Sequence, residues 1–155
     1  MVNKSAGILL FRVNADVVEV LIAHPGGPFW ARKDDGAWSI VKGEFTEAED
    51  PWTAAQREFR EEVGIEVPAG NPIELGTVTQ RGGKIVTAFG IESDLDVSTA
   101  MSNTFEIEWP PKSGKMQSFP EVDRIEWFPV PLARTKLLAA QHPFLDAVEA
   151  FVESR

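Results

Sequence analysis

Three glutamates near the middle of the chain have the type and spacing to do chemistry: Glu58, Glu61 and Glu62. On a helix they share one face, because residues three and four positions apart are neighbours. Like charges at this spacing oppose the helix by about 0.2–0.5 kcal/mol per pair, so a neutralising partner is expected. Hard divalent cations bind carboxylate oxygens, which makes Mg²⁺ the expected cofactor and Mn²⁺ its alternative.

The segment around these glutamates carries the signals of one helix. Asp50 can cap its amino end, and Pro51 suits the first helical position. Gly64 can adopt the left-handed conformation that ends a helix. Four apolar residues recur at helical spacing and predict a face turned to a core: Trp52, Ala55, Phe59 and Val63.

An arginine inside this helix can organise the acidic face. Arg57 lies four residues before Glu61 and can also reach back to the preceding loop, where Glu49 is the expected partner. Such a pair would tie the loop to the helix and hold the carboxylates in position. The alternative is a solvated acidic helix with internal ion pairs, which is the usual meaning of a charge run.

The same stretch resembles the Nudix box, with every defining position filled. Gly43 is followed after five residues by Glu49, and after seven more by REFREEVGI, which is Arg57 to Ile65. The flanks SAGILLFR, GAWSIVKG and EVDRIEWFPV extend the resemblance to a whole domain. It implies one Nudix hydrolase domain over residues 1–155, folded as an α/β/α sandwich with a mixed β-sheet.

The resemblance also implies roles for individual residues. The implied metal ligands are Glu58, Glu61, Glu62 and the backbone carbonyl of Lys42. The implied motif scaffold is Gly43, Glu49, Arg57 and Gly64. A metal at this site would neutralise phosphate oxygens and activate a water for attack on a phosphoanhydride.

The general base stays open between a glutamate of the box, Glu58 or Glu61, and one of a later loop. The later candidates are Glu106, Glu108 and Glu121. Glu121 is preferred because it follows Phe119-Pro120 in an expected loop beside a basic stretch.

Substrate contacts are expected from basic and aromatic residues. The phosphate candidates include Lys42, Arg81, Lys84 and Lys112, and Lys42 stands out because its neighbours place it at the metal site. Trp30 is the preferred residue for stacking on a base, because its neighbours are proline, glycine and charged residues. His24 is expected on the surface.

At two points the sequence differs from the pattern of a particular branch of the family. A lysine before the box glycine resembles the branch that hydrolyses dinucleoside polyphosphates or diphosphoinositol phosphates, but Val41 stands where that branch has proline. The chain has no tyrosine, so the downstream tyrosine typical of asymmetric diadenosine tetraphosphate hydrolases is missing.

Composition and net charge limit the classes of molecule that the protein is expected to bind. The chain has 155 residues, no cysteine and a net charge of −9. This charge disfavours long nucleic acids but allows a small phosphorylated nucleotide, because a bound cation and a few lysines can reverse the field locally. The short apolar run from Ala6 to Phe11 is too short for a membrane span or a signal peptide, so a cytoplasmic protein without a membrane partner is expected. The oligomeric state is left unassigned.

The other strands and loops are predicted from the alternation of apolar and polar residues and from turn-forming residues. The expected strands are Ser5–Arg12, Val17–Ala23, Ile73–Gln80, Lys84–Glu92, Thr104–Trp109 and Arg124–Val130. The expected loops include His24–Pro28 and a basic stretch from Pro110 to Ser118, and helical spacing is found in Leu132–Ala140 and Pro143–Val152.

The sequence therefore predicts a divalent-metal-dependent pyrophosphohydrolase that acts on a nucleoside triphosphate or a dinucleoside polyphosphate. One alternative is a non-catalytic nucleotide-sensing module, for which a lost box carboxylate would be the hallmark, and none is lost. The other is a pyrophosphohydrolase acting on the 5′ end of RNA.

Overall fold

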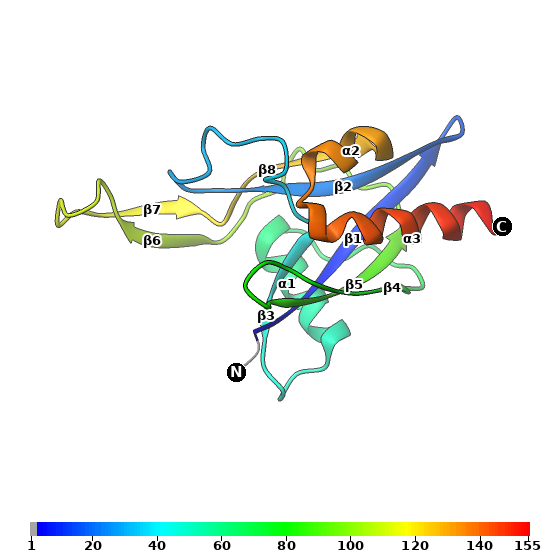
Figure 1. Ribbon diagram of the computed structural model, residues 1–155, viewed down its shortest axis with the longest axis horizontal. Helices are drawn as coiled ribbons and strands as arrows, with labels where there is room; N and C mark the ends of the chain where they lie inside the picture. Colours follow the sequence, from blue (N-terminus) through cyan, green and yellow to red (C-terminus); the bar gives the residue numbers. More distant parts are fainter. Residues whose placement is uncertain (1–2) are drawn as a thin grey trace.

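A six-stranded mixed sheet forms the centre of the computed structural model, which describes residues 3–155 (Figure 1). The strands of this sheet are β1 (Lys4–Asn14), β2 (Val17–Pro25), β3 (Val41–Phe45), β4 (Ile73–Thr79), β5 (Ile85–Glu92) and β8 (Val122–Pro129). Their order is β4-β5-β1-β2-β8, and β3 pairs with β1 off this path. The pairing of β1 with β5 is parallel, whereas β1 pairs antiparallel with β2 and β3.

Two strands share one edge of β1, and this arrangement opens the sheet. β3 pairs with Lys4 to Ile8, and β2 pairs with Phe11 to Asn14. Because β5 occupies the other edge of β1, β2 and β3 must diverge from the same edge. The space between them is where the candidate site lies.

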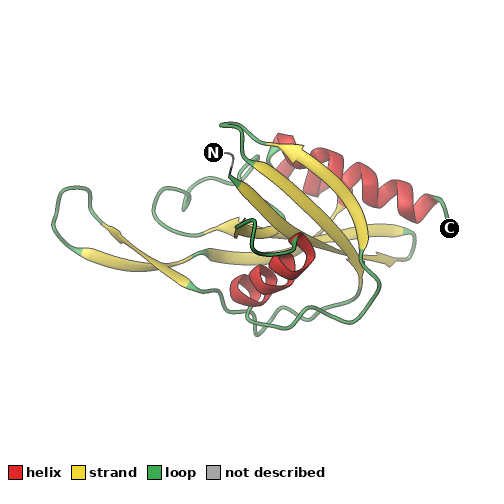
Figure 2. Ribbon diagram, turned by 90° about the horizontal axis from the view of Figure 1, so that it is seen from below, coloured by secondary structure: helices red, strands yellow, loops and turns green. Residues whose placement is uncertain are grey.

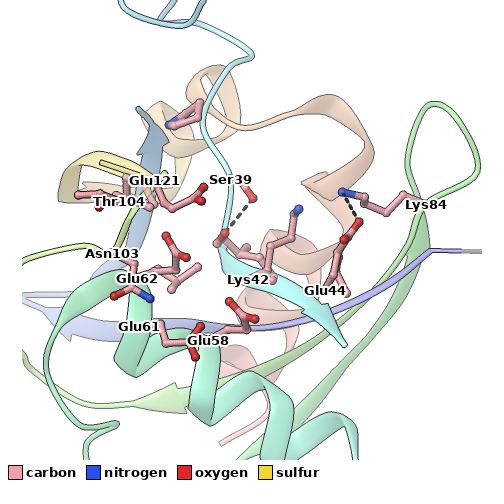
Figure 3. Close-up of a pocket in the computed structure, with 17 residues that line it drawn as sticks. Ser39, Lys42, Glu44, Glu58, Glu61, Glu62, Lys84, Asn103, Thr104 and Glu121 are labelled. Carbon is pink, nitrogen blue, oxygen red and sulfur yellow. Dashed lines mark hydrogen bonds and ion pairs between the residues drawn. The ribbon is translucent and has the colours of Figure 1, made fainter. Parts of the chain in front are cut away.

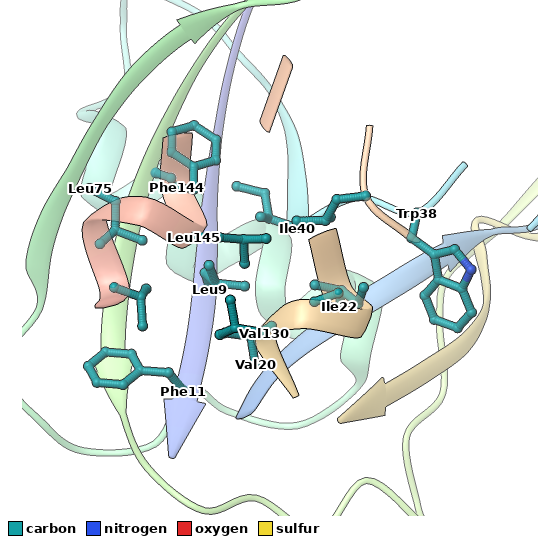
Figure 4. Packing of buried hydrophobic residues seen from close by; sticks show 14 of the residues in the cluster. Leu9, Phe11, Val20, Ile22, Trp38, Ile40, Leu75, Val130, Phe144 and Leu145 are labelled. Atoms are coloured by element: carbon teal, nitrogen blue, oxygen red, sulfur yellow. The ribbon is translucent and has the colours of Figure 1, made fainter. Parts of the chain in front are cut away.

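Helices cover both faces of the sheet, as Figure 2 shows. On one face lies α1 (Pro51–Val63), and on the other lie α2 (Val130–Lys136), the short 3₁₀ helix η1 (Ala139–Gln141) and α3 (His142–Glu153). A hydrophobic core lies on each face of the sheet, and alternate residues of β1 contribute to the two cores. Ile8 packs in the core beneath α1. Leu9 packs in the core beneath α3, which Figure 4 shows. The predicted α/β/α sandwich with a mixed sheet is confirmed.

The local signals of the sequence account for α1. Asp50 accepts a hydrogen bond from the backbone N–H of Thr53 at 3.1 Å, a cap that contributes about 1 kcal/mol. Gly64 has a φ of 76° and ends the helix by donating its N–H to the carbonyl of Arg60. Phe59 and Val63 are fully buried against the sheet, so the carboxylates of the same helix are fixed relative to β3.

A second, two-stranded sheet projects from the body of the molecule in Figure 1. It consists of β6 (Thr104–Glu108) and β7 (Met116–Pro120). The prediction of a basic loop over residues 110–118 is therefore wrong from Met116 onward, where β7 begins. The segment MQSFP lacks the alternation of a half-buried strand, and it becomes a strand only because it pairs with β6.

The helical stretch expected over Leu132–Ala140 is also displaced. α2 begins at Val130 and ends at Lys136, because Leu137 is extended, buried and paired with Trp38. Within residues 3–155, no helix is long and apolar enough to cross a membrane.

Candidate functional site

A cleft of about 510 Å³ opens where β2 and β3 diverge, and it extends over the carboxyl-terminal half of α1 (Figure 3). Its lining is mostly polar and comes from seven parts of the chain. The lining residues are Ser5, Ala23, Pro25, Ser39–Glu44, Glu58, Glu61, Glu62, Lys84, Asn103, Thr104, Glu121 and Val122. The structure thus brings together box residues with residues more than forty positions away.

Four carboxylates face one part of this cleft. Glu58, Glu61 and Glu62 come from α1, and Glu121 comes from the turn between β7 and β8 (Figure 3). Burial, followed by the charges of Glu121, Glu58 and Glu61, raises the pKa of Glu62 to about 7. Burial also raises the pKa of Glu58. This part of the cleft therefore carries negative charge that the protein neutralises only in part.

Gly43 provides the room that the Glu58 carboxylate occupies. A Cβ atom at position 43 would overlap the carboxyl group of Glu58. Glu58 is buried, with 8% of its surface exposed, and its carboxyl group lies against the backbone of Gly43. Strand β3 and helix α1 can approach this closely only because position 43 has no side chain.

Arg57 joins the loop before α1 to the acidic face. Its Nε and Nη2 donate to the two carboxylate oxygens of Glu49 at 2.9 and 2.8 Å, as the sequence predicted. Its Nη1 donates to Glu58 Oε1 at 2.8 Å and lies 3.4 Å from both carboxylate oxygens of Glu61. The hydrogen bonds that Arg57 donates to Glu49 lower the pKa of Glu49, and the same bonds raise the pKa of Arg57 further.

Two lysines face another part of the cleft. Burial, together with the nearby charge of Lys84, lowers the pKa of Lys42 to about 8. Lys84 lies just before β5, and its Nζ is 3.5 Å from a carboxylate oxygen of Glu44 on β3. The cleft therefore combines an acidic part, suited to a cation, with a basic part, suited to phosphate oxygens.

The carboxylates are close but not convergent. Over residues 3–155, no three Asp, Glu or His side chains are gathered tightly enough to hold a metal ion as they are oriented. Glu58 is turned towards Arg57 Nη1. The donors fit a hard cation in type and in charge, and their convergence on one ion would need these side chains to rotate.

Several residues singled out from the sequence lie away from the cleft. Among the described residues, the cleft lining does not include Trp30, Arg81, Lys112, Glu106 or Glu108. Trp30 lies in the loop after β2, 38% exposed, with Lys33 Nζ 5.2 Å from its ring centroid. Arg81 is in the β4–β5 turn and Lys112 is in the turn between β6 and β7.

The expectation that His24 lies on the surface is wrong. His24 belongs to β2 and is fully buried, with its ring against Trp38. Its Nδ1 is 2.7 Å from Asp123 Oδ1, and its Nε2 is 2.6 Å from the carbonyl oxygen of Lys33. The sequence HPGGP indicated a loop, but the strand continues to Pro25, where it pairs with β8, and Asp123 of β8 contacts the imidazole.

Three polar residues of the cleft had no signal in the sequence. Ser39 lines the cleft just before β3, and Asn103 and Thr104 line it at the start of β6. Their types are common in turns and on surfaces, so only the fold could have identified them.

A family model described as NUDIX domain matches residues 1–148, which includes the box and every residue of the cleft. The chain belongs to the Nudix family. This membership supports a hydrolase that acts on phosphoanhydride bonds in nucleotides. No curated protein matches the chain in sequence.

Solved structures of Nudix proteins share this fold. The chain is similar to a C. elegans Ap4A hydrolase, solved as a binary complex, with a TM-score of 0.65 and 22% identity over 99% of this chain and 100% of that one. It is similar to a mutT/nudix family protein from Listeria innocua, with a TM-score of 0.65 and 16% identity over 98% and 94% of the two chains. The NUDIX domain of Shewanella oneidensis NrtR, complexed with ADP ribose, has a TM-score of 0.64 and 15% identity over 98% and 89%.

Proposed function

We propose that this Nudix protein is a divalent-metal-dependent pyrophosphohydrolase that cleaves a phosphoanhydride bond in a nucleoside triphosphate or a dinucleoside polyphosphate. The observation that carries the proposal is one cleft in which the acidic part, made of Glu58, Glu61, Glu62 and Glu121, lies beside two lysines. Such a substrate has a polyphosphate chain whose negative charge a cation and ammonium groups can neutralise. The volume of about 510 Å³ lies in the range of small-molecule sites.

The metal would be Mg²⁺, with Mn²⁺ as an alternative, held by Glu58, Glu61, Glu62 and the backbone carbonyl of Lys42. When bound, the ion neutralises phosphate oxygens and makes a bound water acidic enough to attack. Gly43 leaves room for the carboxylate of Glu58, and Arg57 and Glu49 hold the end of α1 against the loop. Gly64 ends the helix directly after the ligands.

The proton of the attacking water would pass to a glutamate of the same cleft. Glu121 is favoured among the later-loop candidates because it lines the cleft, whereas Glu106 and Glu108 do not. Glu58 and Glu61 remain the candidates within the box. Lys42 and Lys84 would bind the phosphate chain, and the exposed Trp30, Arg81 and Lys112 would reach only a substrate that extends beyond the cleft.

The test is product analysis with Mg²⁺ over a panel of nucleoside triphosphates, dinucleoside polyphosphates and 5′-triphosphorylated RNA. Glu62→Gln should remove most of the activity, because it takes away a charged ligand while keeping the shape of the side chain. Glu66→Gln is the matched control: Glu66 lies just beyond α1, its side chain is 77% exposed, and it does not line the cleft. Full turnover by Glu62→Gln would contradict the metal assignment, and binding without product would favour the sensing alternative.

A further inference from the structure

Gln141 is a fully buried glutamine whose amide oxygen and amide nitrogen are both hydrogen-bonded within the protein. Its Oε1 accepts a hydrogen bond from the backbone N–H of Ile40 at 2.9 Å. Its Nε2 donates to Ser39 Oγ at 3.0 Å and to Gln80 Oε1 at 2.8 Å. A buried amide of this kind fixes its neighbours, because each lost partner leaves a desolvated polar group unpaired.

Two of these contacts hold the cleft wall that leads to Lys42. Ser39 and Ile40 line the cleft, and β3 begins at the next residue, Val41. The Ser39 hydroxyl donates in turn to the carbonyl of Ile40 at 2.8 Å, shown as a dashed line in Figure 3. Gln141 therefore anchors the segment immediately before Lys42 at both a side chain and a backbone amide.

The third contact reaches the segment that carries the other lysine. Gln80 lies at the start of the β4–β5 turn, and its backbone N–H donates to the carbonyl of Lys84 at 2.7 Å. Lys84 Nζ faces the same cleft and lies beside Glu44 of β3. Gln141, which belongs to η1 and lies outside the cleft lining, thus stands between the two segments that present the cleft's lysines.

We propose that Gln141 is a positioning residue for phosphate binding, which fixes the spacing of Lys42 and Lys84 through its hydrogen bonds to Ile40 and Gln80. This inference rests on the proposed function, since it assumes that a polyphosphate chain occupies the cleft. A single buried amide then links the C-terminal helical layer to both lysine-bearing segments. Small displacements of such groups reduce catalysis strongly, because the phosphates must be held at defined positions.

The test is Gln141→Met, which keeps the length of the side chain and removes all three hydrogen bonds. We expect the affinity for a non-hydrolysable methylene analogue of ATP, measured by calorimetry with Mg²⁺, to fall about tenfold. The exchange of the Ile40 amide hydrogen should become faster. Lys84→Met should weaken binding in the wild-type background and much less in the Gln141→Met background, because coupled residues are not additive.

Val148→Ala is the control for a purely structural role. Val148 is fully buried in α3, in the core that covers the same face of the sheet, and it does not line the cleft. Its loss should lower the unfolding temperature while the affinity for the analogue stays at the wild-type value. Should Gln141→Met fail to fold, Gln80→Met breaks only the link towards Lys84 and should weaken binding by itself.

The outcomes separate this inference from the proposed function. Wild-type affinity of Gln141→Met for the analogue overturns the positioning role, even if the enzyme turns over nucleotides. Binding by the wild-type chain without any product overturns the proposed function, while the comparison of affinities still decides the role of Gln141. Absence of binding by the wild-type chain, together with absence of product over the nucleotide panel, overturns both.

Discussion

The carboxyl group of Glu58 occupies the volume into which a side chain at Gly43 would extend. The two residues belong to different elements, β3 and α1, and each is held by its own core contacts. Glycine is needed at position 43 for this close approach, not for an unusual backbone conformation. The cleft thus depends on an absent side chain as much as on the carboxylates themselves.

We predict that Gly43→Ala keeps the fold and loses most of the activity. The atoms in the way are the end of a flexible side chain, so the cost to stability is small, but the Glu58 carboxylate must turn away. A displaced ligand or supporting group typically costs about 10–100-fold in metal affinity or activity. Thermal unfolding and steady-state rates at several Mg²⁺ concentrations measure both effects.

Gly36→Ala is the comparison for a generic glycine effect. A Cβ at Gly36 meets nothing within 4 Å, although its φ of 74° is strained for alanine. This variant should therefore lose stability and keep the Mg²⁺ dependence of the wild type. The reverse pattern, with Gly43→Ala as active as the wild type, would mean that the position of Glu58 does not matter.

We predict that Arg57→Lys lowers activity about 10–100-fold with little change in helix content. Lysine keeps the positive charge but cannot make the paired hydrogen bonds to Glu49 while also reaching Glu58. Arg60→Lys is a matched control on the same helix, because Arg60 is exposed and its contact with Glu66 is 3.6 Å long. Circular dichroism reports the helix content of the two variants, and kcat/KM at equal protein concentration reports their activity. A loss of kcat/KM in Arg60→Lys as large as in Arg57→Lys would contradict the prediction.

The pKa of Glu62, raised to about 7, predicts a pH dependence. The folded protein without metal binds this proton more tightly than the unfolded chain, so its stability should fall as pH rises from about 4.5 through 7. A divalent cation competes with the same proton, so the affinity for Mg²⁺ should fall as pH drops below 7. Calorimetry in buffers of different ionisation enthalpy should detect proton release on Mg²⁺ binding near pH 6.5, and Glu62→Gln should release fewer protons. Equal proton release by the variant would contradict this assignment.

Local patterns predicted α1 well because its determinants are short-range. Asp50, Gly64 and the apolar spacing act within one helix, and the Glu49–Arg57 pair joins neighbouring segments. The position of Lys84 in the cleft depends on the parallel pairing of β5 with β1, which no local pattern encodes. A strand such as β7 and a buried polar residue such as His24 or Gln141 are set by partners far along the chain. Sequence reasoning therefore found the acidic half of the cleft and only part of its surroundings.

The positions of the basic residues yield a last prediction about substrate binding. Lys42→Met and Lys84→Met should each raise KM about tenfold or more, because both ammonium groups face the cleft. Arg81→Met and Lys112→Met should change KM for a nucleoside triphosphate less than about twofold, because their side chains lie in exposed turns outside it. For a dinucleoside polyphosphate, a larger effect of Lys112→Met or Trp30→Ala would show that the substrate reaches past the cleft along the β6–β7 hairpin and the loop after β2. Equal effects of all four charge-removing variants on the triphosphate would instead indicate a diffuse electrostatic attraction, and salt should then abolish the differences from wild type.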